Sequence, residues 1–135
     1  MWVSGITRRR RHGVLAEMVA VADRSGDYTT PWRAAPQVWE HYRSEADILR
    51  DLQQDWRAAL ASAVYLAIEA GQGDLQHDVV KAFATVSKRH AGARRILEAN
   101  ATHPAIESAM RKERALLSSF ADVLTAVPTA VPSAA

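Results

Sequence analysis

The strongest constraint in this sequence is a stretch of 34 residues, 37–70, that contains neither glycine nor proline. Both residues disfavour helix interiors, proline because it lacks an amide donor and glycine because it loses more backbone entropy. Apolar and aromatic side chains in this stretch recur at steps of three, four or seven, which places them on one helix face. They are Val38, Tyr42, Leu49, Leu52, Trp56, Leu60, Ala63 and Ala67. The pattern predicts one long helix over residues 37–70.

The second half of this predicted helix carries almost no charge. Arg57 and Glu69 enclose eleven consecutive uncharged residues, 58–68. A helix that is apolar around its whole circumference is usually buried. We therefore expect this half to be a central helix that packs on more than one face.

A second helix is predicted over residues 74–99. Gly71 and Gly73 end the first helix, and Asp74 belongs to the residue types that cap helix N-termini. The apolar stripe continues in phase through Gly92, which favours one continuous helix because a glycine costs only about 1 kcal/mol relative to alanine. The opposite interpretation is a DNA-binding helix-turn-helix with its turn at Gly92.

A third helix is predicted over residues 104–125, because Pro104 suits the first helical position and an apolar stripe follows it. The connections between the predicted helices are short, so neighbours in the chain are antiparallel. The predicted fold class is all-α, with an antiparallel up-down-up three-helix bundle over residues 37–125. The chain is alanine-rich, with 26 alanines, so these helices can approach one another closely.

The segments outside the bundle have weaker patterns. Residues 1–36 are predicted to be a basic N-terminal arm, with a short helix over 14–23 and then a loop that contains Trp32. Residues 126–135 contain proline and alanine but little that could join a core, which predicts a disordered tail.

The positive charge of the chain lies in the arm. Lysines and arginines number 17 against 15 acidic residues, a net charge of +2. Residues 1–17 hold four arginines and one glutamate, so the rest of the chain holds 13 basic and 14 acidic groups, a net charge of −1. The four arginines are consecutive: Arg8, Arg9, Arg10 and Arg11. Such a run can bind nucleic-acid phosphates or an anionic membrane surface, belong to an export signal, or be an appendage without a specific role. A further alternative is that translation begins at Met18, which would leave residues 1–17 out of the native protein.

Two lines of like charge run along the predicted helices. The acidic line on the first helix consists of Asp47, Asp51 and Asp55. The basic line on the second helix consists of Lys81, Lys88 and Arg95, with Arg89 and Arg94 beside it. A solvated face explains the acidic line more simply than a divalent metal does. Together with the arginine run, the basic line predicts nucleic-acid binding as the alternative function.

Cysteine is absent from the sequence, which excludes disulfides, thiolate metal sites and cysteine nucleophiles. His41 with Glu45, and His103 with Glu107, can each share a helix face, but both differ from the Glu-x-x-His pattern of di-iron bundles. His90 is a lone histidine on the apolar stripe of the second helix. Neither a catalytic triad nor a phosphate-binding glycine loop is recognisable. We therefore expect no enzymatic activity, no metal and no cofactor.

Aromatic residues near the start of the bundle indicate where a protein partner could bind. Tryptophan and tyrosine dominate interface hot spots, and the residues concerned are Trp32, Trp39 and Tyr42. The alternative is that Trp32 folds back over the helix end. The first helix, at about 50 Å, is longer than its neighbours, which leaves surface for a dimer. The expected function is that of a cytoplasmic, non-enzymatic helical protein without a membrane span, which binds another protein or a second copy of itself.

Overall fold

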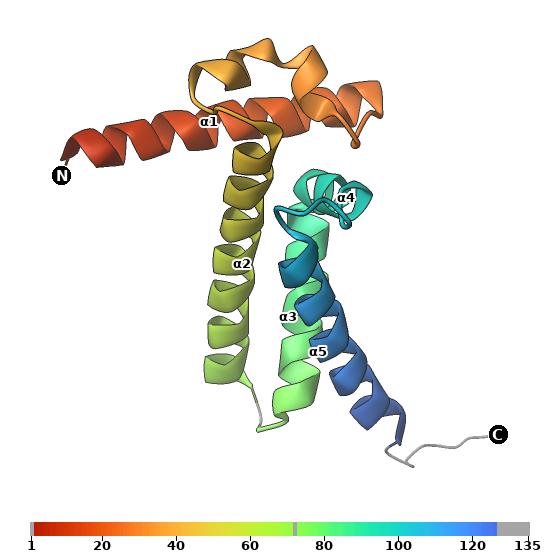
Figure 1. Ribbon diagram of the computed structural model, residues 1–135. Coiled ribbons are helices and arrows are strands. Elements are labelled where there is room, and N and C mark those ends of the chain that lie inside the picture. Colours follow the sequence, from red (N-terminus) through yellow and green to blue (C-terminus); the bar gives the residue numbers. More distant parts are fainter. Residues whose placement is uncertain (1, 72, 127–135) are drawn as a thin grey trace.

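The computed structural model describes residues 2–71 and 73–126, with side chains described for residues 9–71 and 73–119. All regular secondary structure in these residues is helical, so the predicted all-α class is confirmed (Figure 1). The elements are α1 (Trp2–Ser25), the 3-10 helices η1 (Pro31–Ala34) and η2 (Pro36–Glu40), α2 (Glu45–Ala70), α3 (Leu75–Arg89), α4 (Ala91–Ala99) and α5 (Glu107–Ala126). No helix within the described ranges combines the length and apolar character that a membrane crossing requires. Most of the predicted tail, residues 127–135, lies outside the described residues.

The N-terminal segment is a long helix rather than an arm with a short one. Figure 1 shows α1 lying across the ends of α2 and α4, with η1 and η2 folded over it. Leu15, Met18 and Ala22 of α1 are buried, which makes the helix part of the core. Its partners in that core are Trp32, Ala35, Val38, Ile48, Leu49, Leu52, Ile96, Leu97, Ile106 and Met110. The segment therefore cannot be removed without opening the core.

The predicted first helix starts too early. The chain over residues 36–40 forms η2, and α2 begins only at Glu45. Ser44 has an extended backbone (φ −155°, ψ 164°), and its side chain accepts a hydrogen bond from the amide of Asp47 at 3.2 Å. The Ser44 side chain satisfies one of the free amides of the first turn and so fixes the start of α2 at Glu45.

The predicted second helix is two helices, α3 and α4, separated at His90 (φ −115°, ψ 42°). Its predicted N-cap is confirmed, because the Asp74 carboxylate accepts the amide of His77 at 3.1 Å. The prediction of one continuous helix over residues 74–99 is wrong, because the helix breaks at His90, two residues before Gly92. A Cβ atom on Gly92 would lie 2.7 Å from Cγ1 of Val19, so the break turns α4 against α1 at a distance that only glycine allows.

The third helix begins three residues later than predicted. Pro104 lies in a turn, where the His103 ring nitrogen Nδ1 accepts the amide of Ala105 at 3.0 Å, and α5 starts at Glu107. Close backbone contacts run along α2 and α3 and along α3 and α5, whereas α2 and α5 have few. An open groove of about 530 Å³ lies between α2 and α5 instead. The predicted three-helix bundle is therefore not confirmed: the described residues form five α-helices, with an open side between α2 and α5.

The Gly92 contact separates two effects of a glycine-to-alanine substitution. Intrinsic helix propensity favours alanine by about 1 kcal/mol. Gly92→Ala must also displace Val19 and Asp23, and overpacking typically costs about 1–3 kcal/mol. We expect Gly92→Ala to lower the free energy of unfolding in urea titrations.

The matched control is Gly13→Ala, because Gly13 lies inside α1 with open space around its Cβ position. It is expected to raise stability by up to about 1 kcal/mol. A stabilising Gly92→Ala would contradict the close approach of α1 and α4.

Candidate functional site

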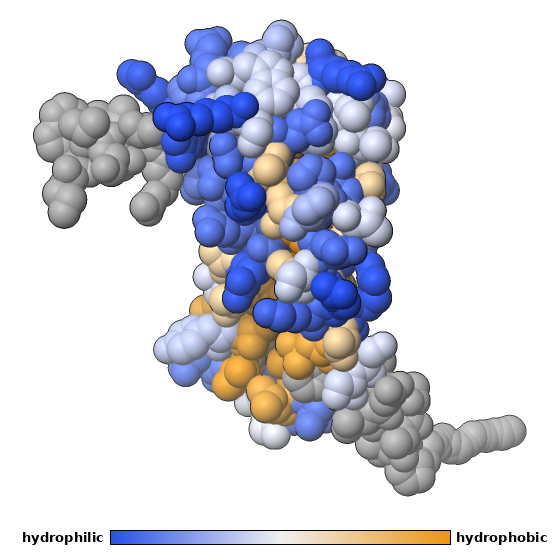
Figure 2. All heavy atoms as spheres, in the orientation of Figure 1, coloured by the Kyte–Doolittle hydropathy of each residue, from blue (hydrophilic) through white to orange (hydrophobic). Residues whose placement is uncertain are grey.

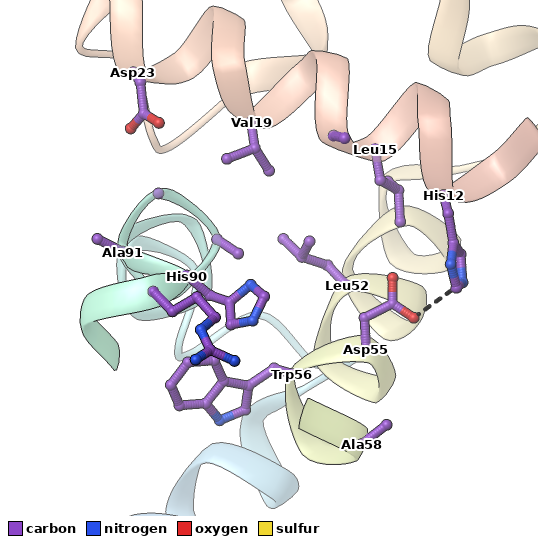
Figure 3. A pocket seen from close by; sticks show the side chains of 14 residues that line it. His12, Leu15, Val19, Asp23, Leu52, Asp55, Trp56, Ala58, His90 and Ala91 are labelled. Carbon is purple, nitrogen blue, oxygen red and sulfur yellow. Dashed lines mark ion pairs between the residues drawn. The ribbon is translucent and has the colours of Figure 1, made fainter. Parts of the chain in front are cut away.

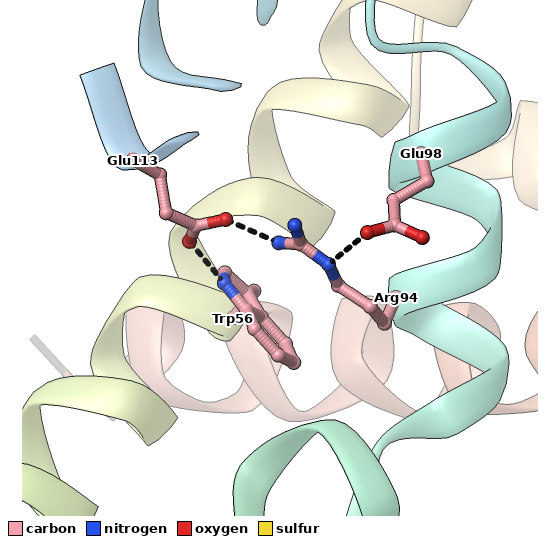
Figure 4. Close-up of polar contacts among 4 residues, drawn as sticks. All are labelled: Trp56, Arg94, Glu98 and Glu113. Atoms are coloured by element: carbon pink, nitrogen blue, oxygen red, sulfur yellow. Dashed lines mark hydrogen bonds and ion pairs between the residues drawn. The ribbon is translucent and has the colours of Figure 1, made fainter. Parts of the chain in front are cut away.

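A polar network joins α2, α4 and α5 (Figure 4). Trp56 donates its indole N–H to Oε2 of Glu113 at 2.7 Å, and Arg94 donates to the other carboxylate oxygen of Glu113. Arg94 also donates to Glu98 at 2.9 Å. The Arg94 guanidinium carbon lies 4.9 Å from the Trp56 ring centroid and 5.2 Å from that of Phe83. With side-chain exposures of 14% and 11%, Arg94 and Glu113 form a largely desolvated pair that holds the helices together.

Two of the basic residues predicted to bind nucleic acid contact other side chains of the protein, and the other described ones are exposed. Arg94 lies in the network of Figure 4, and Arg95 donates to the Tyr28 hydroxyl at 3.3 Å with its guanidinium over that ring. The remaining residues of the basic line are exposed on α3: Lys81, Lys88 and Arg89. In the arginine run, the described side chains are exposed, and they are Arg9, Arg10 and Arg11; the side chain of Arg8 lies outside the described residues. Nucleic-acid binding stays a prediction.

The aromatic residues predicted to bind a partner do not form an exposed cluster. Trp32 is 3% exposed and packs in the core, as the fold-back alternative requires. Tyr42 is 6% exposed, donates its hydroxyl to Asp51 at 2.8 Å, and lies under the guanidinium of Arg11. Burial, and then the Asp51 carboxylate, raise the pKa of Tyr42. Only Trp39, at 43% exposure, remains at the surface.

Each carboxylate of the acidic line contacts another described side chain. Asp47 pairs with Arg50 at 3.1 Å on the same helix, and Asp51 accepts the Tyr42 hydroxyl. Asp55 pairs with Nε2 of His12 on α1 at 3.2 Å. Arg50 lies three residues from Asp47 in the sequence, whereas Tyr42 and His12 come from outside α2. The basic line of α3 and α4 supplies none of these contacts. No three metal-ligating side chains gather among the residues whose side chains are described.

A cavity of about 520 Å³ lies where α1, α2 and the junction of α3 and α4 meet (Figure 3). We call it the α1–α2–α4 cavity. Nine of its fourteen lining residues are apolar and five are titratable. The titratable residues are His12, Asp23, Asp55, Arg89 and His90. Figure 3 shows the His12–Asp55 pair on one side of the cavity and His90 with Trp56 on another.

The electrostatic state of Asp55 reflects its position on this cavity. Burial raises its pKa above the ordinary value, and the neighbouring Asp51 adds to the rise, whereas His12 acts in the opposite direction. The ionised carboxylate is therefore less favourable at this position than in water. The four-residue spacing of Asp51 and Asp55 is visible in the sequence, whereas the contact with His12 was not predicted, because His12 lies on a segment predicted to be outside the bundle.

An exposed apolar surface covers the far half of α2, away from α1. Figure 2 shows apolar side chains gathered over this end of the molecule. Tyr65 and Leu66 are 65% and 66% exposed, and Ile68, Leu75 and Leu116 are exposed as well. We define the distal face of α2 as the exposed residues Ala61, Ser62, Tyr65, Leu66 and Ile68. The expected burial of this half on more than one face is wrong, because α5 leans on α3 and leaves α2 open.

No family model, no curated protein and no solved structure matches this chain.

The Arg94–Glu113 pair gives a prediction for stability. Arg94→Met leaves the Glu113 carboxylate largely desolvated without its cation, which should cost about 3 kcal/mol. The double variant Arg94→Met/Glu113→Gln should recover more than half of this loss, since the carbonyl of the introduced glutamine can still accept the Trp56 indole N–H. The measurement is a double-mutant cycle by urea unfolding, with Arg95→Met as the control at the exposed neighbour. Additive losses would contradict the pairing.

The raised pKa of Asp55 gives a prediction for pH dependence. A group whose pKa is raised on folding stabilises the fold fully below its ordinary value of 3.8, and this contribution is lost as pH rises through the raised pKa. Asp55→Asn does not ionise at this position. We expect the stability of the original chain relative to Asp55→Asn to be greatest below pH 3.8 and to fall as the pH rises through the raised pKa, by less than about 1 kcal/mol because the carboxylate is partly solvated. Urea titrations at several pH values check this, and a pH-independent difference would contradict it.

Proposed function

We propose that this protein is a non-enzymatic helical interaction module that self-associates, with the distal face of α2 packed antiparallel against the same face of a second copy. The observation that carries the proposal is the exposure of Tyr65 and Leu66, each about two-thirds accessible, within the uncharged stretch 58–68. Exposed contiguous apolar patches on soluble domains mark interaction surfaces. Tyrosine in such a patch is a typical interface anchor.

The composition of the distal face suits helix–helix packing. Ala61 and Ser62 are small, so a second helix can approach closely at their level, while Tyr65 and Leu66 supply the area to be buried. These positions follow the three- and four-residue steps of one helix face. A face of this kind can meet a copy of itself across a twofold axis, which is the commonest symmetry of protein dimers.

The flanking charges favour an antiparallel arrangement with a second copy. Arg57 and Glu69 are exposed and lie at opposite ends of the uncharged stretch. When two α2 helices cross antiparallel near Ala63, Arg57 of each copy falls at the level of Glu69 of the other. Opposite charges meet at both ends in this arrangement, whereas parallel packing would oppose like charges.

The first test replaces the apolar centre of the face. Leu66→Glu places a charge where the proposal buries a leucine, so the dissociation constant should rise at least about tenfold. Gln54→Glu is the matched control, because Gln54 is exposed on the same helix but lies outside the face. Sedimentation equilibrium measures both. A protein that is monomeric at concentrations up to about 100 μM would overturn the proposal.

The second test uses the flanking charges. Arg57→Glu and Glu69→Arg each oppose like charges at both ends of the antiparallel pair, so each variant should dimerise more weakly, by about threefold to tenfold. The double variant Arg57→Glu/Glu69→Arg restores both pairs and should recover the original affinity. An equimolar mixture of the two single variants should form heterodimers in preference to either homodimer. Random pairing in native mass spectrometry of the mixture would contradict the antiparallel arrangement.

A further inference from the structure

The α1–α2–α4 cavity has the size and lining of a small-molecule site. Its volume of about 520 Å³ lies within the range of about 300–1,000 Å³ that is typical of ligand pockets. Leu15, Leu52 and Trp56 are buried residues that form part of its apolar wall. An apolar wall with a few polar groups on one side is the usual composition of such a site. This cavity is separate from the distal face of α2.

The acidic groups on the cavity already have partners. Asp55 pairs with His12 at 3.2 Å. Asp23 accepts the Tyr28 hydroxyl at 2.7 Å. It also lies beside the first turn of α4, since its carboxylate would be within 2.7 Å of a Cβ on Gly92. A carboxylate at a helix N-terminus complements the positive end of the helix dipole, so Asp23 has a structural role there.

The cationic side of the cavity has no such partner. Arg89 and His90 lie at the junction of α3 and α4, and neither makes an ion pair with another residue whose side chain is described. The arginine side chain carries a fixed charge and a planar donor pair that fits a carboxylate. His90 offers a ring N–H donor in either protonation state. Arg89 therefore places a positive charge without an ion-pair partner among the described side chains beside an apolar wall.

We infer that this cavity binds a small molecule with an apolar body and a single carboxylate. The carboxylate would pair with Arg89 and His90, and the apolar body would lie against Leu15, Leu52 and Trp56. A polyanion such as a nucleotide fits poorly, because Arg89 is the one residue with a fixed positive charge among the described lining residues.

The test measures binding of octanoate and of 4-phenylbutyrate to the full chain, each compared with its uncharged amide. The amide resonances of Ala91, Gly92 and Ala93 report on the cavity by NMR, because these residues line it. Saturable shifts with a dissociation constant of about 1 mM or below are expected for at least one carboxylate, with binding of its amide weaker by about fivefold or more.

Two variants locate the site. Arg89→Gln should weaken carboxylate binding by about fivefold to tenfold, whereas Lys88→Gln, an exposed neighbour that does not line the cavity, should leave it unchanged. Ala16→Phe places a ring on the wall of the cavity and should weaken both probes. Three results would overturn the inference: neither carboxylate gives saturable shifts, the uncharged amide probes bind as tightly as the carboxylates, or Arg89→Gln leaves carboxylate affinity unchanged. None of the variants changes the distal face of α2. The result for ligand binding is therefore independent of whether the protein self-associates.

Discussion

The arrangement of the helices depends on the desolvated Arg94–Glu113 pair and the indole N–H of Trp56 that completes it. Three helices, α2, α4 and α5, each contribute one of these side chains, and Phe83 of α3 packs against both Arg94 and Trp56. A partly buried ion pair is favourable only when its hydrogen-bonding groups are satisfied. The network therefore requires α4 and α5 to reach α2 at one level, and this requirement positions α5 even though α2 and α5 have few close backbone contacts elsewhere.

The burial of side chains differs between the two ends of the molecule on either side of the Trp56–Arg94–Glu113 network. At the end of the molecule where α2 begins, α1 and the two 3-10 helices cover the core, and Met18, Val38 and Ile48 are fully buried there. Beyond the network, α5 follows α3, so nothing in the described chain covers the outer side of α2. The exposed Tyr65 and Leu66 result from this divergence, and they are the basis for the proposed contact with a second copy. The α1–α2–α4 cavity lies at the covered end, where three elements meet without filling the space between them.

Part of this structure was predictable because it depends on neighbours in the sequence. The Asp74 cap and the apolar stripe of α2 involve residues within a few positions of one another. The break at His90 was not predictable in the same way, because the stripe stays in phase through it, and the close approach of Gly92 to Val19 that accompanies it involves another helix. The role of α1 was missed for a similar reason. Its run of four arginines indicated a solvated arm, although Leu15 and Met18 follow directly in the same helix.

The sequence by itself determined that the chain is helical, where its charges lie, and that residues 58–68 carry none, because composition and periodicity act over a few turns of chain. Tertiary structure alone decided which of these features meet. It paired Asp55 with His12 of α1, placed Arg94 in a network with Trp56 and Glu113, and left the uncharged half of α2 exposed. The physical reason is that burial and ion pairing depend on distances between helices, and helices that contact one another at a single level can diverge elsewhere without any change in their own periodicity.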